Sequence, residues 1–351
     1  MIRAMYSGIS GLKVNQNKLD VVGNNIANSG TTSYKSQSIL FQDALSQNVS
    51  EATGPSVNVG GTNPSQMGLG VQVGSIDSDT TQGSLQPTNR NLDFAVDGDG
   101  YFVVGKGKLS DMVALTGPSD TATDTIDSST STMQINFTRD GAFKRDYDGN
   151  LLTSDGYRVM GYALISTGDG SSSEASIVQP ADDADDMTTS YNYANGNDDT
   201  KLTASDDSKK LIPLGIPDSI KVGDNTEMVK SFSVDANGVI KATLANGSIA
   251  ALGQIAMTSF KNPEGLNKEG KNLLESSANS GTAVLRTPVG TTTDSNDKAF
   301  GSIRQNKLEA SNVDLAEQFT DMIVASRSFQ ANGKIITTSD EILESLVNLK
   351  R

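Results

Sequence analysis

The first stretch whose residue types suggest chemistry is Gly100-Tyr-Phe-Val-Val-Gly105-Lys106-Gly107. Its glycine and lysine spacing nearly matches the loop that cradles nucleotide phosphates. That loop requires Ser or Thr after its lysine to ligate magnesium, and here the position holds Gly107. The intervening Tyr-Phe-Val-Val is typical of a strand rather than of a loop with free amides. We therefore expect no nucleotide and no other cofactor at this segment.

Two acidic segments are candidates for metal binding. Asp97-Gly-Asp99-Gly resembles the start of a calcium loop, but the further oxygen ligands and the glutamate at the twelfth position are missing. Asp182, Asp183, Asp185 and Asp186 lie in the least apolar part of the chain, where nothing would exclude water from a carboxylate. We expect a turn and a solvated loop, and no metal site, at these two places.

Composition excludes several classes of function. The chain has 351 residues with no Cys and no His, which removes disulfides, thiolate metal sites and His-dependent catalytic triads. No Gly-x-Ser-x-Gly motif is present, so an enzyme is not indicated. The net charge of -14 argues against nucleic-acid binding. No apolar run is long enough to cross a membrane or to act as a secretory signal, so the default location is the cytoplasm.

The elements that organise the chain are amphipathic segments at its two ends. Near the N-terminus apolar residues recur every seven positions, which predicts a helix over about 3–28 that ends in a left-handed cap at Asn28 or Gly30. The same seven-residue spacing near the C-terminus predicts a helix over about 313–349, with Ser311 and Asp314 as its capping box. The predicted seam residues are Met5, Ile9, Leu12, Leu19 and Ile26 in the first helix, and Leu315, Phe319, Met322, Phe329, Ile336, Leu343 and Val347 in the second.

Between the helices the periodicity changes to that of short strands. Residues 92–104 have two apolar runs around a four-residue turn, which predicts a hairpin. Residues 135–164 contain three Asp-Gly turns, and residues 231–260 contain two Asn-Gly turns between strand-like runs. The predicted fold class is α+β: long terminal α-helices forming a coiled-coil-like core domain, plus a central, mainly antiparallel β domain with a small insertion.

Composition also predicts the domain boundaries. The paired helices would occupy 1–30 and 308–351, with flexible linkers at 31–70 and 286–307 that are rich in Gly, Ser, Thr or Asp. The β-rich domain would span 71–164 and 211–285. Residues 165–210 hold ten Asp or Glu against three Lys, which predicts a solvated insertion, either loop-like or a small outer domain.

The apolar surface of the terminal helices exceeds what one helix pair can cover. The ordinary interpretation is that both helices pack on the protein's own core. However, the seven-residue spacing favours helix-on-helix seams, and further apolar residues such as Val22, Ile323 and Leu346 lie beside them. Copies of the same chain would cover this surface, and head-to-tail contacts that do not close produce filaments. Asn24, Asn25 and Asn28 would cap free carbonyls and bridge to neighbours at the helix end.

Three groups of segments resemble the family of flagellar rod and hook proteins. Leu19-Asp-Val-Val-Gly-Asn-Asn-Ile-Ala-Asn-Ser-Gly-Thr-Thr-Ser-Tyr-Lys35 resembles the signature that these proteins share, including Asn24, Asn25 and Asn28. Residues 308–351 resemble the C-terminus of hook proteins in particular. Residues 91–104, 137–157 and 253–266 resemble the family's β domain. The resemblance covers most of the chain, but residues 105–133 and 165–210 match no family motif.

This resemblance implies a structural subunit rather than an enzyme. Hook subunits are exported unfolded, without a cleaved signal, and polymerise outside the cell into a curved, flexible tube that joins rod to filament and transmits torque. The implied partners are the subunit itself, the distal rod, the hook cap, the hook-filament junction proteins and the export apparatus. Because isolated long helices are marginal in water, we expect the termini to be disordered in the monomer and to fold on assembly.

Two alternatives remain at this point. One is the distal rod protein, which shares the Asn signature but forms a rigid shaft; the long segment 46–70 is consistent with a stiffening insertion in a rod. The other is a β-rich surface enzyme or adhesin acting on glycans, which would need convergent carboxylates and no heptads at its termini.

Overall fold

The computed structural model describes residues 2–55, 60–107, 113–116, 124–126, 133–166, 177–178, 192–197, 202–204, 210–222, 225–286 and 300–349. The chain divides into two compact units. Unit 1 contains residues 1–81 and 311–351, and unit 2 contains residues 82–310. The described residues are mostly β-sheet with one helix at each terminus.

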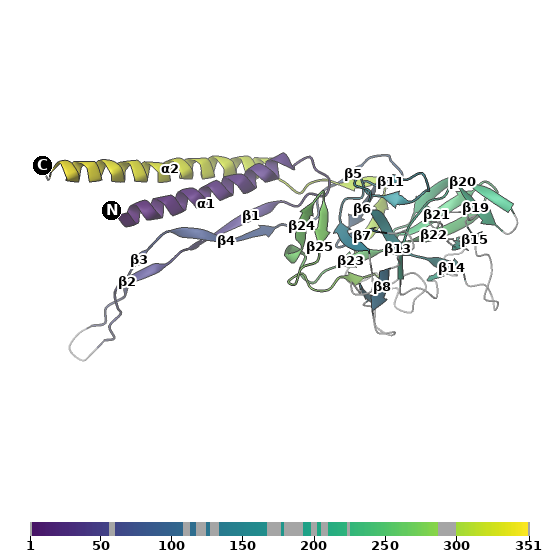
Figure 1. Ribbon diagram of the computed structural model, residues 1–351, viewed down its shortest axis with the longest axis horizontal. Coiled ribbons are helices and arrows are strands. Elements are labelled where there is room, and N and C mark those ends of the chain that lie inside the picture. Colours follow the sequence, from purple (N-terminus) through teal and green to yellow (C-terminus); the bar gives the residue numbers. More distant parts are fainter. Residues whose placement is uncertain are drawn as a thin grey trace. The chain divides into compact units, whose positions relative to one another are not determined.

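Two long helices dominate unit 1. Helix α1 spans Ile2–Ala27 and α2 spans Leu315–Asn348, which confirms both predicted helices to within two residues. They lie antiparallel, and α2 extends past the first residues of α1 (Figure 1). Neither helix, within the part of the chain that the structure describes, is apolar enough to cross a bilayer.

The predicted caps of these helices were wrong in detail. Asp314 is itself the N-cap of α2, and its carboxylate accepts hydrogen bonds from the amides of Ala316 and Glu317 at 2.8 and 3.4 Å. Ser311 instead accepts a bond from the amide of Val313. At the end of α1 neither Asn28 nor Gly30 has a positive φ; the left-handed residue is Ser33, with φ of 56°. The chain therefore leaves α1 through overlapping turns before it reverses direction.

A long β-hairpin runs beside α1 where composition indicated only a linker. Strand β1 (Gln37–Asp43) pairs with β4 (Val71–Ser78), and beyond them β2 (Ser46–Ser50) pairs with β3 (Ser65–Gly68). Helix α1 lies between this hairpin and α2 (Figure 1). The linker prediction missed β2 and β3, which are fully exposed and carry no apolar run, and β1, whose run Ile39-Leu40-Phe41 is short. Strand β4 lies within the predicted β-rich domain at 71–164.

Unit 2 is an antiparallel β structure. In the described residues, eighteen strands join one continuous hydrogen-bonded system, and every pairing in it is antiparallel. The strands of its first half are β5 (Leu85–Pro87), β6 (Phe94–Asp97), β7 (Tyr101–Lys106), β8 (Val113–Thr116), β9 (Asp124–Ile126), β10 (Gln134–Thr138), β11 (Lys144–Arg145), β12 (Leu151–Leu152), β13 (Arg158–Tyr162), β14 (Leu164–Ser166) and β15 (Ile177–Val178). Strands β5, β6 and β14 pair outside that continuous system.

The second half of unit 2 continues this antiparallel arrangement, and its last strands return to pair with the first strands of the unit. Its strands are β16 (Asn192–Asn195), β17 (Leu202–Ala204), β18 (Lys210–Pro213), β19 (Ser219–Val222), β20 (Asn225–Val234), β21 (Val239–Leu244), β22 (Ile249–Ile255), β23 (Met257–Ser259), β24 (Asn267–Gly270), β25 (Leu273–Glu275), β26 (Val284–Leu285), β27 (Ser302–Gln305) and β28 (Lys307–Glu309). The last two pair with the first two: β27 with β6, and β28 with β5.

The glycine turns of unit 2 were predicted with mixed success. The Asn-Gly turns connect β20 to β21 and β21 to β22 as hairpins, with φ of 84° at Gly238 and 87° at Gly247. The predicted hairpin at 92–104 was wrong, because β6 pairs with β27 whereas β7 pairs with β10. The turn at Gly98 and Gly100 thus takes the chain from one sheet to another. A local pattern cannot reveal this, because each strand finds its partner far along the sequence.

Parts of the acidic insertion join the β structure. Within 165–210 the described strand β16 pairs with β22, β15 pairs with β19, and β17 pairs with β14. Tyr193 and Leu202 are buried in unit 2. The cluster from Asp182 to Asp186 lies outside the described residues. The predicted linker at 286–307 contains β27 and the first residue of β28, and its residues 287–299 also lie outside the residues that the structure describes.

Candidate functional site

The predicted seam residues are half-buried or exposed in the single chain, and at least Ile336 takes part in the α1–α2 contact, with its Cγ1 3.3 Å from a Cβ built on Gly8. On α1, Met5, Leu12, Leu19 and Ile26 are half-buried and Ile9 is exposed. On α2, Met322, Ile336 and Leu343 are half-buried, and Leu315, Phe319, Phe329 and Val347 are exposed. Their assignment to contacts between subunits stays a prediction. In the single chain five of them are 40–68 % exposed: Ile9, Leu315, Phe319, Phe329 and Val347.

Small and polar residues form the centre of the contact between the two helices. The buried positions of α1 are Gly8, Gly11, Val14, Val22 and Asn25. A Cβ added at Gly11 would lie 2.7 Å from the side-chain nitrogen of Asn332, so the helices approach closely there. On α2 the buried residues are Ala325 and Ser339. Small residues at Gly8 and Gly11 therefore allow the two helices to approach closely.

Many of the bulkier apolar side chains of the helices are exposed, although Ile335 and Ile336 also approach Gly8 of α1. Ile323 is 62 % exposed and Val324 is 53 % exposed, although both are large aliphatic residues. Tyr6 and Ile9 on α1, and Ile335, Ile342, Leu346 and Leu349 on α2, are also exposed. We call this set, together with Leu315, Phe319, Phe329 and Val347, the outer apolar face. Exposed apolar surface of this extent is typical of a site of protein–protein contact.

The amide of Asn25 is the centre of a hydrogen-bond cluster where α1 ends. Its side-chain nitrogen donates to the carbonyl of Gln37 at 2.7 Å and to Oε1 of Gln318 at 3.0 Å. Its oxygen accepts from the amide of Gln37 at 3.0 Å and from the hydroxyl of Tyr34 at 3.1 Å. A side-chain amide has two donor hydrogens and two acceptor lone pairs, and Asn25 uses all four. It thereby joins α1, α2, β1 and the connection between α1 and β1.

The other two asparagines of the predicted signature act locally. Asn28 donates to the backbone carbonyl and the side-chain oxygen of Asn24, both at 2.9 Å, and accepts from the hydroxyl of Thr31. Asn24 donates to the hydroxyl of Tyr34 at 3.3 Å. Within the single chain these amides bond a helix carbonyl and reach Tyr34, Gln37 and Gln318. That they also bridge to neighbouring helices of an assembly stays a prediction.

Sequence reasoning missed a fourth amide with a similar role. Asn312 accepts from the amide of Ser36 at 2.7 Å and donates to the carbonyl of Asp79 at 3.0 Å. It ties the segment before α2 to both strands of the hairpin base. Neither Asn312 nor Gln318 stands in a repeating pattern, so no local signal identified them.

Burial changes the acid–base behaviour of the cluster. Desolvation raises the pKa of the Tyr34 phenol above its ordinary value of 10.0. The phenol therefore stays protonated at neutral pH and can donate to Asn25.

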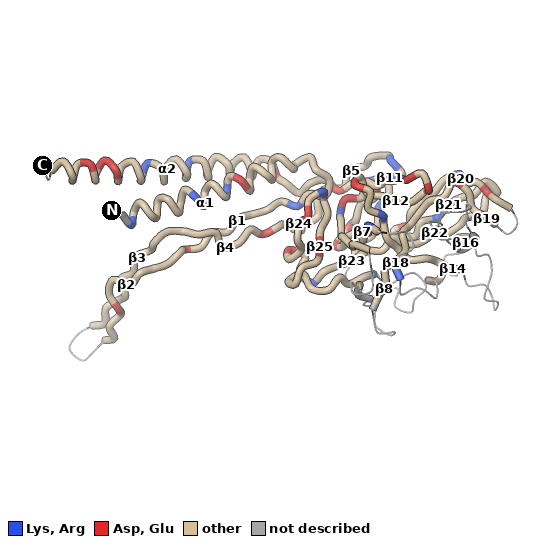
Figure 2. Tube along the Cα trace, viewed as in Figure 1, with Lys and Arg blue, Asp and Glu red and all other residues tan. Residues whose placement is uncertain are grey.

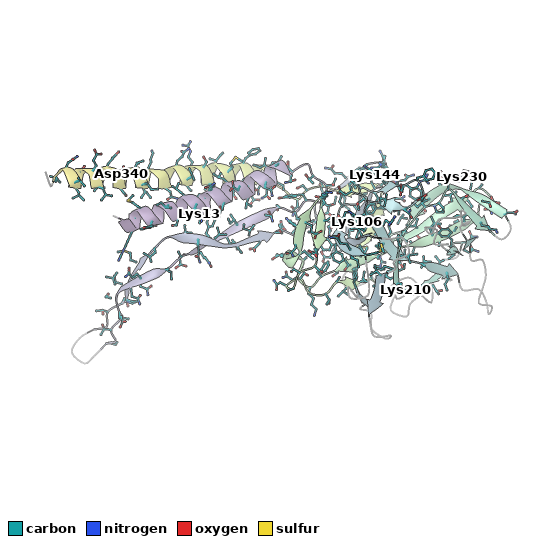
Figure 3. The ribbon with its side chains drawn as sticks, viewed as in Figure 1. Lys13, Lys106, Lys144, Lys210, Lys230 and Asp340 are labelled. Carbon is teal, nitrogen blue, oxygen red and sulfur yellow. The ribbon has the colours of Figure 1, made fainter. Side chains whose placement is uncertain are left out.

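Charges on unit 1 are sparse and unevenly placed. Lys18 on α1 and Asp321 on α2 form an ion pair at 3.3 Å. Acidic residues Asp340, Glu341 and Glu344 gather near the free end of α2 (Figure 2). Lys13 and Asp340 are both exposed on their helices (Figure 3). Because the residues of the outer apolar face are themselves uncharged, contacts that they make depend mainly on burying apolar surface.

The segments that suggested chemistry have structural roles. Residues 101–105 lie buried in β7, and Lys106 at its end stands 5.7 Å from the ring centre of Tyr157. Asp97 forms an exposed ion pair with Arg304 at 3.2 Å. No group of three or more acidic side chains with metal-binding geometry occurs among the residues that the structure describes.

Comparison with known proteins identifies the kind of molecule to which these helices belong. Three family models match: a flagella basal body rod protein model at residues 5–35, a flagellar hook protein FlgE/F/G D1 domain model at 127–242, and a flagellar basal body rod FlgEFG protein C-terminal model at 304–349. The chain is 36 % identical to the flagellar basal-body rod protein FlgG of Bacillus subtilis, with all of both chains covered. The chain belongs to the flagellar hook and rod family.

Members with both names are found among the relatives. The chain is 30 % identical to the flagellar hook protein FlgE of Borreliella burgdorferi, and the alignment covers all of both proteins. It is 27 % identical to the flagellar hook protein FlgE of Escherichia coli, and that alignment covers 99 % of this chain and all of the relative. The family is a structural component of the flagellum and not an enzyme, which removes the surface-enzyme alternative. The matches at 5–35 and 304–349 contain nearly all of α1 and all of α2, including Asn25 and the outer apolar face.

Proposed function

We propose that this chain is the subunit of the flagellar hook. In this proposal it is exported without a cleaved signal and assembles outside the cell into a curved, flexible tube between rod and filament, which acts as a universal joint for motor torque. Its partners would be other copies of itself, the distal rod, the hook cap, the hook-filament junction proteins and the export apparatus. The C-terminal sequence from Lys334 to Arg351, which resembles that of hook proteins, supports the hook assignment.

The observation that carries self-assembly is the outer apolar face. The buried residues of the two helices are mainly glycine, alanine, serine and asparagine with two valines, whereas many isoleucine, leucine, valine and phenylalanine side chains are exposed. Burying one such side chain stabilises a contact by about 1.5–3 kcal/mol. Other copies of the chain, arranged with helical symmetry, would cover this surface along the whole length of α2.

The division of the chain into two units supports a flexible joint. The chain passes between the units only at residues 81–82 and 310–311. Units joined by two short covalent connections can change their relative placement without unfolding. We propose that the helices form the continuous inner part of the polymer and that the β units shift as it bends.

The distal rod protein is the second candidate, and one observation favours it. Alignment with the rod protein of B. subtilis runs over 351 residues, the length of this chain, whereas alignments with the hook proteins of B. burgdorferi and E. coli run over 473 and 425. The hook alignments therefore contain insertions relative to this chain. The β2–β3 extension of the hairpin is compatible with a stiffening element of a rod.

Electron microscopy of the polymer formed by the full-length chain distinguishes these candidates. A curved tube that takes up several curvatures supports the hook, and a straight, stiff cylinder supports the rod. Polymer from a variant lacking residues 46–68 serves as a comparison, because β1 and β4 retain their pairing without the extension. A chain that forms no polymer under any condition would contradict both candidates.

A further inference from the structure

A buried ion pair lies at the place where the chain enters and leaves unit 2. Nε of Arg139 is 2.6 Å from Oε2 of Glu309. The side chain of Glu309 is 0 % exposed and that of Arg139 is 6 % exposed. The two residues are 170 positions apart in sequence. Taking two charges out of water is costly, so a pair in this position calls for an explanation.

Glu309 holds together the two segments that connect unit 2 to the rest of the chain. Its Oε1 accepts a hydrogen bond from the amide of Gly83 at 2.9 Å. Next to it, the amide of Ala310 donates to the carbonyl of Ser84 at 2.9 Å. Unit 2 begins at residue 82 and ends at residue 310. Glu309 therefore bonds the incoming and outgoing segments within one residue of both connections.

Arg139 fastens this junction to the body of the β structure. Its two terminal nitrogens donate to the carbonyl of Gly100 at 3.0 Å and to that of Gly98 at 2.5 Å. Its guanidinium also lies 6.0 Å from the ring centre of Tyr101 at the start of β7. Gly98 and Gly100 have φ of 116° and 133°, which favour glycine, so the turn presents its carbonyls in a conformation that other residues rarely adopt.

We infer that Arg139 and Glu309 form a mechanical clamp that prevents β5 and β28 from sliding past each other when force reaches unit 2 through its two connections. A force that bends one unit against the other pulls one connection and pushes the other, which shears the β5–β28 pair. An apolar pair of equal volume would fill the same space, but it could not bond the amide of Gly83 or the carbonyls of Gly98 and Gly100. The mechanical purpose rests on the proposed function, whereas the clamp itself can be tested in a single chain.

Hydrogen exchange of the full-length chain, measured by mass spectrometry on short peptides, tests the clamp. Glu309→Gln keeps the shape, but its amide cannot accept from both Arg139 and Gly83. Arg139→Lys keeps the positive charge, but a lysine ammonium group cannot reproduce the planar set of hydrogen bonds that the arginine guanidinium makes. The matched control is Asp97→Asn, which removes the exposed Asp97–Arg304 pair between the neighbouring strands β6 and β27.

The clamp predicts a local effect. In both test variants, peptides containing Gly83 and Ala310 should exchange at least about tenfold faster, while β7 keeps its protection and Asp97→Asn changes neither. Unchanged protection at Gly83 and Ala310 would overturn the inference. So would an equal increase across the whole of unit 2, because that would show a general contribution to stability. Polymer formation by the unaltered chain is a separate measurement, so failure of the clamp leaves the proposed function standing.

Discussion

The side chains of Asn25 and Gln318 meet at 3.0 Å, where the end of α1 lies beside the first turns of α2. This is one of four hydrogen bonds that the fully buried Asn25 amide makes, and the others bind Gln37 and Tyr34. A buried amide that finds all its partners in only one alignment specifies how two helices are placed along each other. Asn25 therefore fixes the register of the helix pair and attaches the hairpin to it.

Removal of this amide should weaken the folded helical unit. Asn25→Ala leaves Gln37 and Gln318 with buried groups that lack partners, at a cost of about 1–3 kcal/mol for each unsatisfied group. We expect the assembled polymer to lose its helical circular dichroism signal at a lower temperature. Asn24→Ala, at an exposed position of the same turn, is the control and should have a much smaller effect. If Asn25→Ala and Asn24→Ala lowered the melting temperature by the same amount, the role assigned to Asn25 would be contradicted.

Close approach of the helices should make Gly11 intolerant of large side chains. Gly11→Leu would push α1 away from Asn332, whose side-chain atoms lie 2.7–3.2 Å from an added Cβ. Gly23→Leu is the matched control, because a Cβ at Gly23 meets nothing within 4 Å and leucine favours helix by up to about 1 kcal/mol over glycine. We measure the melting temperature of the helical circular dichroism signal in the soluble chain with an osmolyte added. This temperature should be lower for Gly11→Leu and higher for Gly23→Leu than for the unaltered chain. If both variants lower the melting temperature by the same amount, the contact at Gly11 is not specific.

Polarity introduced on the outer apolar face should impair assembly without unfolding the chain. Ile323→Ser removes one large exposed side chain from α2, and the critical concentration for polymerisation should rise about tenfold or more. Met228→Ser in β20 is the control, because Met228 is similarly exposed, at 61 %, but belongs to unit 2. Pelleting assays over a range of protein concentrations give the critical concentration of each variant. If Ile323→Ser polymerises like the unaltered chain, this part of the face is not an assembly contact.

High pH should destabilise the amide cluster through Tyr34. Because burial raises the pKa of Tyr34 in the folded chain above 10.0, the folded state favours the protonated phenol. The stabilisation is fully present below pH 10 and is lost as the pH rises through the folded-state pKa. We expect the helical signal of the polymer to melt at progressively lower temperature above pH 10, and Tyr34→Phe to reduce that dependence. An identical pH dependence in Tyr34→Phe would assign the effect to other groups.

Sequence periodicity located the helices but not the face by which they pair. The seven-residue pattern through Leu12 and Leu19 is real, yet the buried positions are Gly11 and Val14, one and two positions from Leu12. Periodicity reveals that a helix has an apolar stripe and cannot tell whether the stripe meets the same chain or another copy. Small residues such as Gly8 and Gly11 leave no hydrophobic signal, although they permit the closest approach of the two backbones.

The remaining misses have a common physical cause, which is that partners distant in sequence determine structure. The strands around Gly98 form where apolar runs predicted them, but β6 pairs with β27, roughly 200 residues away. The hydrogen bond between Asn25 and Gln318 joins residues 293 positions apart, and nothing in the sequence around one of them indicates that the other is its partner. Asparagine enrichment at the end of α1 did identify the right residue type. Only the folded structure shows which of the asparagines is buried.

Sedimentation velocity of the full-length chain over a wide range of concentrations tests most directly whether the outer apolar face exists to bind other copies. We predict a transition, as concentration rises, from the 36.8 kDa monomer to large assemblies, displaced to higher concentration by Ile323→Ser and not by Met228→Ser. A chain that sediments as a monomer at every concentration, with both terminal helices protected from hydrogen exchange, would contradict the account.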